Sequence, residues 1–189
     1  MTARIAKLDV RTLSDQQREL YDAITGGPRA AGPQLFRLTD EDGRLEGPFN
    51  AMLLSPVLGG ALQSLGSAVR YRSGFSDRCR EIAILVVGHT WNSEFEIYAH
   101  QRVARAAGLT QEDLAALAGD RPDLLPDDLE RLVATTTSAL AGPADLTDEQ
   151  YELAVAGLGE ALLFELTTLV GYYSLLALQL RIFRVGVTR

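Results

Sequence analysis

The two histidines of the chain, His89 and His100, stand at the ends of one 12-residue segment. Glu96 lies four residues before His100, so on a helix the two side chains share one face, about 6 Å apart. A histidine beside a carboxylate has a raised pKa and can act as a general acid or base near neutral pH. The segment therefore predicts proton-transfer chemistry centred on His100.

A helical hairpin would position these side chains. Ser76 has the character of an N-cap for a helix over 77–89, whose length favours a helix although its apolar core also suits a buried strand. Residues 90–92 form the predicted turn. A second helix follows over 93–107, and Gly108 comes directly after it, where a helix commonly ends.

The hairpin brings a second carboxylate to His100. Glu81 and His100 are each nine to ten residues from the centre of the turn, about 14 Å along either helix axis at 1.5 Å per residue. Residues at equal distance from the turn lie level with each other in an antiparallel pair. We therefore expect Glu81 to approach His100 across the hairpin.

Each of these residues also has a structural explanation, which the sequence leaves open. Ser93 and Glu96 have the spacing of a capping box, which explains both without any chemistry. His100 could be a hydrogen-bonded core histidine. Glu81 lies near a helix N-terminus, where the dipole stabilises a carboxylate. His89 could cap the C-terminal end of its helix.

The composition excludes several other kinds of site. Cys79 is the only cysteine, which excludes an intramolecular disulfide, a CxxC redox pair and a multi-thiolate metal site. Lys7 is the only lysine, on a polar N-terminal segment that looks poorly buried, and is a poor candidate for Schiff-base chemistry. No metal-ligand spacing stands out, so we expect neither a metal nor a cofactor. The 25 acidic residues against 18 basic ones argue against nucleic-acid binding.

The length of 189 residues suits a single globular unit with an elaborated end. Residues 1–47 are expected to form an N-terminal helix, over 15–25, and an irregular arm, and residues 48–189 an all-α domain; the whole chain would have six to eight helices. The helix predicted over 56–72 has an apolar face made of Val57, Leu58, Ala61, Leu62, Leu65, Ala68 and Val69. No secretory signal is visible, so a cytoplasmic protein is the expectation.

One segment, 161–180, is about as long and apolar as a membrane span. It contains Glu165, however, and a carboxylate in mid-span costs roughly 2.5–3.5 kcal/mol on insertion scales. A helix buried in a core or between subunits has the same composition. We therefore expect no membrane, and a homo-oligomer that covers this helix.

Several motifs together resemble the carboxymuconolactone decarboxylase and alkylhydroperoxidase D-like family. They are Glu81-Ile-Ala-Ile-Leu, then Ser93-Glu-Phe-Glu96-Ile-Tyr-Ala-His100, then Ala104 to Gly108, and a final helix with Glu165 and Gly171-Tyr172-Tyr173. The resemblance covers roughly residues 48–187. It implies a helical bundle around the antiparallel hairpin at about 77–107, assembled as a trimer or hexamer.

The same resemblance implies a reaction class. Peroxidase-type members carry Cys-x-x-Cys-x-x-x-His, and here Ser93 and Glu96 stand at the two cysteine positions, so a disulfide cannot cycle. The chain is more similar to the decarboxylase side of the family, which acts on small carboxylated lactones. His100 would then carry the proton, Glu81 would orient its ring, Glu96 would be a second acid/base or orienting group, and Ser93 would donate a hydrogen bond to substrate.

The substrate would be a small molecule whose carboxylate calls for arginine. Trp91, Arg80 and Arg102 are the expected substrate-binding residues, although Arg70 and Arg72 are also close in sequence. Two other functions stay open at this point. One is peroxidase activity, which the missing cysteine pair disfavours, and the other is ligand binding or assembly without catalysis.

Overall fold

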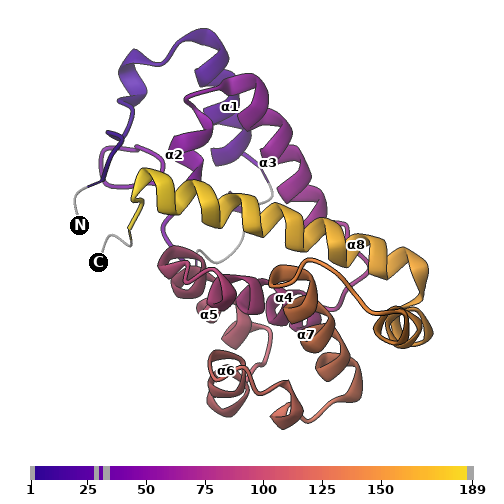
Figure 1. Cartoon of the computed structure of the whole chain (residues 1–189). Coiled ribbons are helices and arrows are strands. Elements are labelled where there is room, and N and C mark those ends of the chain that lie inside the picture. The colour runs from indigo at the N-terminus through magenta and orange to yellow at the C-terminus, as the bar shows by residue number, and fades with distance from the viewer. Residues whose placement is uncertain (1–2, 28–29, 32–34, 187–189) are drawn as a thin grey trace. The chain divides into compact units, whose positions relative to one another are not determined.

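The computed structural model describes residues 3–27, 30–31 and 35–186, and the regular secondary structure of this part of the chain is helical, apart from one isolated β-bridge between Thr39 and Leu45 (Figure 1). The α-helices are α1 (Asp15–Thr25), α2 (Pro48–Met52), α3 (Pro56–Tyr71), α4 (Asp77–Thr90), α5 (Glu94–Ala106), α6 (Gln111–Ala118), α7 (Asp128–Ala141) and α8 (Asp148–Phe183). Two 3-10 helices span Val10–Thr12 and Pro122–Leu124. The predicted all-α class is confirmed, while residues 28–29 and 32–34 of the predicted arm lie outside the described residues.

The chain divides into two compact units, one of residues 1–72 with 178–189 and one of residues 73–177. The composition changes instead after residue 47. The first unit contains α1, α2, α3 and the last turns of α8, and the second contains α4 to α7 with the rest of α8. The candidate site belongs to the second unit.

Side-chain hydrogen bonds hold the N-terminal segment in the first unit. The Asn50 amide accepts a bond of 2.9 Å from the main-chain N–H of residue 8 and donates one of 3.1 Å to the carbonyl of residue 6. Arg4 donates to the last carbonyls of α8, through its main-chain N–H to Phe183 and its guanidinium to Ile182. A cation at the C-terminal end of a helix satisfies open carbonyls and complements the helix dipole.

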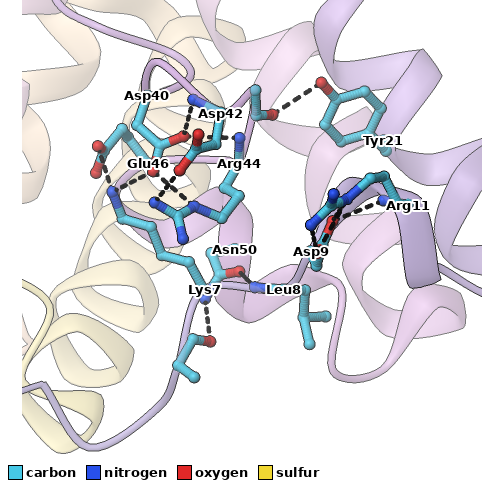
Figure 2. Close-up of polar contacts among 12 residues, drawn as sticks. Lys7, Leu8, Asp9, Arg11, Tyr21, Asp40, Asp42, Arg44, Glu46 and Asn50 are labelled. Atoms are coloured by element: carbon cyan, nitrogen blue, oxygen red, sulfur yellow. Dashed lines mark hydrogen bonds and ion pairs between the residues drawn. The ribbon is translucent and has the colours of Figure 1, made fainter.

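The single lysine, Lys7, also helps to anchor this N-terminal segment (Figure 2). Figure 2 shows the Lys7 ammonium between two carboxylates, 3.0 Å from Oδ2 of Asp40 and 2.5 Å from Oε1 of Glu46. Arg44 donates to the same Asp40 carboxylate at 2.9 Å. Burial lowers the pKa of Lys7, but the two acceptors outweigh it and raise that pKa above its usual value. These ion pairs anchor the N-terminal segment more firmly than its polar sequence indicates. The raised pKa keeps the Lys7 amine protonated, so it is not a nucleophile.

The helix predicted over 56–72 is present as α3, but most of its apolar face is not the buried one. Val57 and Leu58 are 76% and 66% exposed, and the buried residues of α3 are Gly59, Gln63, Gly66 and Val69. The reason is close packing at a glycine. A Cβ at Gly59 would lie 2.2 Å from the Met52 carbonyl oxygen, so only the glycine-bearing face can approach α2 so closely.

Helix α4 is the central helix of the second unit and packs against α5, α6 and α7. Its residues from Cys79 to Gly88 are all buried. This burial on every side explains why the segment is as apolar as a buried strand. The Ser76 side chain accepts from the N–H of Cys79 at 3.1 Å, so the predicted cap is confirmed.

A charged network ties α4 to its neighbours. Arg78 donates to Glu130 of α7 at 2.5 Å and to Asp113 of α6 at 3.3 Å. Its guanidinium also donates to the carbonyl of Gly108, which ends α5 with a φ of +93° as predicted for this glycine. The network thus holds α6, α7 and the end of α5 to the N-terminal end of α4.

Helix α8 changes direction at Gly159, whose φ and ψ are 76° and 161°. By length and composition α8 could also cross a membrane, the one such helix in the described residues, and 33% of its most apolar window is buried. One chain therefore does not bury this helix as a core helix. An exposed apolar face remains, with Phe164 the most exposed of its large side chains at 72%.

Candidate active site

Glu81 of α4 and His100 of α5 meet in the seam of the hairpin. Nδ1 of His100 lies 2.7 Å from Oε2 of Glu81, a hydrogen-bond distance. The side chain of Glu81 has no exposed surface, and His100 is 6% exposed. The expected contact is present, although Glu81 lies nine residues before the end of α4 at Thr90 and His100 only six residues after the start of α5 at Glu94.

The contact with Glu81 assigns the ring nitrogens of His100 different roles. A carboxylate facing Nδ1 favours the tautomer, or the protonated ring, in which Nδ1 carries hydrogen. Nε2 is then the atom through which the ring can exchange a proton with a substrate. Arg80 adds positive charge on the other side, with Nε 3.7 Å from Oε1 of Glu81 and Nη2 2.5 Å from Asp77.

Tyr173 of α8 completes the surroundings of the imidazole. Its ring meets that of His100 edge to face, with the centroids 5.2 Å apart, and Tyr172 meets Tyr173 in the same way at 5.2 Å. Both tyrosines are buried. Tyr173 is not among the site residues predicted from the sequence. The sequence signal that could have identified this residue is the Tyr172-Tyr173 pair, which is part of the resemblance to the final helix of the family.

Ser93 and Glu96 do not form the capping box that their spacing allows. Ser93 is the N-cap residue of α5, yet its hydroxyl accepts no hydrogen bond from the helix. Ser93 is 7% exposed and Glu96 is 3% exposed. The Ser93 hydroxyl and both Glu96 carboxyl oxygens lack a hydrogen-bond partner among the described residues. The capping interpretation is therefore wrong, and the two side chains are buried polar groups that need another explanation.

Burial raises the pKa of the Glu96 carboxyl to about 8. The Ser93 hydroxyl lies close enough to offset part of this rise, although the two groups do not have the geometry of a hydrogen bond. A buried carboxyl without a cation or hydrogen-bond donor is favoured in its neutral form. At neutral pH, Glu96 is therefore a carboxylic acid able to donate a hydrogen bond.

The structure does not bring every expected site residue to the Glu81–His100 pair. Arg102 is exposed, and its guanidinium stacks 3.6 Å from the ring centre of Tyr98 on the same helix. Trp91 is half-buried in the α4–α5 turn. Arg80 does touch the pair, through its Nε atom and Oε1 of Glu81.

The remaining histidine and the cysteine lie apart from this seam. His89 lines a cavity of about 370 Å³ with Thr90, Asp120 and Ser138, whose lining does not include the site residues. Burial lowers the pKa of His89 and raises that of the Cys79 thiol. Cys79 is 3% exposed. No group of three or more His, Cys, Asp or Glu side chains among the described residues is arranged to hold a metal ion.

Comparisons with known proteins agree with this architecture. The model of the carboxymuconolactone decarboxylase family matches residues 56–123, which include α3 to α6 and the whole hairpin. A solved structure of the debrominase Bmp8, an alanine variant in complex with 2,3,4-tribromopyrrole, has the same fold at a TM-score of 0.74 and 14% identity. That similarity covers 100% of this chain and 93% of the debrominase. No curated protein matches the chain significantly.

Proposed function

We propose that the chain is a member of the carboxymuconolactone decarboxylase family, whose model matches residues 56–123, and that it is an acid/base lyase acting on a small carboxylated lactone or a related metabolite. The observation that carries the proposal is the buried hydrogen bond of 2.7 Å between Glu81 and His100. A buried imidazole oriented by a carboxylate is suited to carrying a proton between solvent and a bound substrate.

The proposed reaction needs one proton on carbon. The bond between the carboxylate and the ring carbon breaks, carbon dioxide leaves, and the electron pair passes into a dienolate. His100 delivers a proton from Nε2 to the carbon, and solvent then reprotonates the ring. Glu81 keeps Nδ1 hydrogen-bonded throughout, which stabilises the imidazolium before the proton is given up.

A small cyclic ligand is compatible with this fold. The debrominase with the same fold was solved with a brominated pyrrole bound. Arg80 lies 3.7 Å from Glu81, and its positive charge would attract an anionic substrate towards the pair. These observations support a small anionic ring compound as the substrate. A shared fold indicates such a class of ligand better than it indicates one particular compound.

A thiol peroxidase is the less favoured function. Ser93 and Glu96 occupy the positions where the resemblance predicts the cysteine pair, and neither side chain can form a disulfide. Cys79 is buried, its pKa is raised, and it has no second cysteine to pair with. Hydroperoxide consumption in the presence of a dithiol reductant, surviving in Cys79→Ser, would favour this function instead.

The test of the lyase proposal compares the two histidines. The purified protein is incubated with carboxymuconolactone and a panel of small carboxylated lactones in deuterium oxide. Carbon dioxide release and deuterium at the new C–H bond are then followed. His100→Asn should abolish turnover while the circular dichroism spectrum stays native, and His89→Asn should keep it. Full turnover in His100→Asn contradicts the proposal, and a folded wild type that binds these lactones without turnover favours the non-catalytic function.

A further inference from the structure

We propose that Ser93 and Glu96 form an oxyanion seat, in which a neutral carboxyl and a hydroxyl donate hydrogen bonds to the carbonyl oxygen of the substrate. This inference rests on the proposed function and specifies its substrate class. The substrate would carry a carbonyl group conjugated with the carbon that loses its carboxylate. That oxygen is where the negative charge of the dienolate collects, so donors beside it stabilise the transition state.

The first observation behind this proposal is an unsatisfied pair of buried side chains. A buried polar group left without a hydrogen bond destabilises the folded chain, and a charged group does so more strongly. Ser93 could avoid that cost by capping α5, as its position and spacing allow, but its side chain does not. The Ser93 hydroxyl lies close to the Glu96 carboxyl but without hydrogen-bond geometry, and the described residues offer these three buried atoms no other hydrogen bond, which indicates that a ligand completes them.

The second observation is the position of the pair along the seam. Ser93, Glu96 and His100 are spaced by three and four residues, so they form one stripe along α5. The stripe faces α4, because a Cβ added to Gly88 would lie 3.7 Å from the Cβ of Glu96. Glu81 lies two turns before Gly88 on the same side of α4 and contacts His100. The proton carrier and the proposed seat are therefore neighbours, about 6 Å apart, which a small ring can span.

The protonation state of Glu96 suits this role. A carboxylate would repel a developing oxyanion, whereas a carboxylic acid kept neutral by apolar surroundings donates a hydrogen bond to it. The pKa of about 8 keeps Glu96 mostly protonated at neutral pH. The bound group must therefore be an oxygen that accepts hydrogen bonds and gains negative charge during the reaction, and a substrate ammonium or guanidinium would not fit.

The experiment uses para-nitrophenol as the probe, because its phenolate resembles an enolate oxygen and has its own absorbance band. Its binding to the wild-type protein at neutral pH is compared with that of four variants. Glu96→Gln keeps a neutral donor and should bind within a few-fold of wild type. Glu96→Leu should bind roughly tenfold or more weakly, as expected for a lost hydrogen bond to a charged group. Ser93→Ala should weaken binding several-fold, and the exposed Glu94→Gln is the matched control.

Two results would overturn the seat. One is wild-type affinity in Glu96→Leu, and the other is a loss in Glu96→Gln as large as in Glu96→Leu, which would mean that a charged carboxylate is needed. If Glu96→Leu does not fold, infrared spectroscopy decides. The wild type should show the C=O stretch of a protonated carboxyl that shifts when the phenolate binds and is missing in Glu96→Gln. A wild-type spectrum without that band also contradicts the proposal.

The His100 variant separates this inference from the lyase proposal. His100→Asn should lose turnover but still bind para-nitrophenolate, because the donors of the seat are intact. Turnover that persists in His100→Asn overturns the proposed function and leaves the binding results to decide the seat. If His100→Asn loses turnover while phenolate binding is unchanged by the substitutions at residues 93 and 96, only the proposed seat is overturned.

Discussion

Glu81 has no exposed surface, and its Oε2 atom lies 2.7 Å from Nδ1 of His100 on the neighbouring helix. A carboxylate buried this completely is costly unless a charged or hydrogen-bonding partner compensates for the lost hydration. His100 supplies that partner, and Arg80 adds a cation 3.7 Å from the other oxygen. The three side chains therefore form an electrostatic unit that depends on each member.

Glu81→Gln should reduce kcat by about 100-fold or more, because the amide cannot stabilise the imidazolium of His100 as a carboxylate does. The substrate KM should change much less, since Glu81 has no exposed surface to offer a ligand. Steady-state kinetics with the substrate identified in the panel measure both values. Glu94→Gln, an exposed glutamate on α5, is the control. A Glu81→Gln variant with wild-type kcat would remove Glu81 from the mechanism.

The buried acid Glu96 should make the protein less stable as the pH rises. Its folded pKa is about 8 against an ordinary value of 4.5, so between these values the folded state holds a proton that the unfolded state has lost. This contribution to stability is complete below about 4.5 and is lost as the pH rises through 8, by about 1.4 kcal/mol per pH unit. Urea unfolding across that range should show this slope in the wild type and not in Glu96→Gln. Equal slopes in both proteins would contradict the assigned protonation state.

Cys79 should resist thiol reagents in the folded protein. The side chain is 3% exposed, and burial raises the pKa of its thiol, so little thiolate is present at neutral pH. An aromatic disulfide reagent should label the native protein slowly and the guanidinium-unfolded protein at once. Rapid labelling of the native state would reopen thiol chemistry as a function of this protein.

Asp40 should stabilise the N-terminal segment at neutral pH and lose this effect in acid. Burial raises the pKa of its carboxyl, but hydrogen bonds from Lys7, the main chain and Arg44 outweigh burial and bring it to about 2. The stabilisation is present above the ordinary value of 3.8 and fades as the pH falls through about 2. Asp40→Asn should therefore lower the melting temperature at neutral pH and have little effect near pH 2. Asp22→Asn, at an exposed position of α1, is the control. If Asp40→Asn lowers the melting temperature as much in acid as at neutral pH, Asp40 acts through packing rather than charge.

The exposed apolar face of α8 should mediate self-association. Phe164 is 72% exposed and Leu153 is 58% exposed, and a monomer gains nothing from apolar side chains left in water. Light scattering should give a multiple of 20.5 kDa, and Phe164→Asp should lower that mass. Leu124→Asp, in a 3-10 helix and 60% exposed, is the control. A wild-type mass near that of one chain at micromolar concentration would contradict the prediction.

The regular geometry of the α-helix made part of this protein predictable from the residues alone. The cap at Ser76 and the end of α5 at Gly108 depend on interactions within a few residues. The approach of Glu81 to His100 followed from the constant rise per residue on both sides of a short turn. Local hydrogen bonding and helix periodicity are properties that a sequence displays directly.

Contacts between distant residues decided the rest. Ser93 and Glu96 have a spacing that fits either a cap or a buried pair, and only the folded structure shows that the two side chains are buried without forming the cap. The buried face of α3 depends on how closely the Met52 carbonyl approaches Gly59, which outweighs the pattern of apolar residues. Tyr173 reaches His100 from 73 residues away in the chain. No local pattern records such a contact, because steric fit and burial arise only when separate helices pack together.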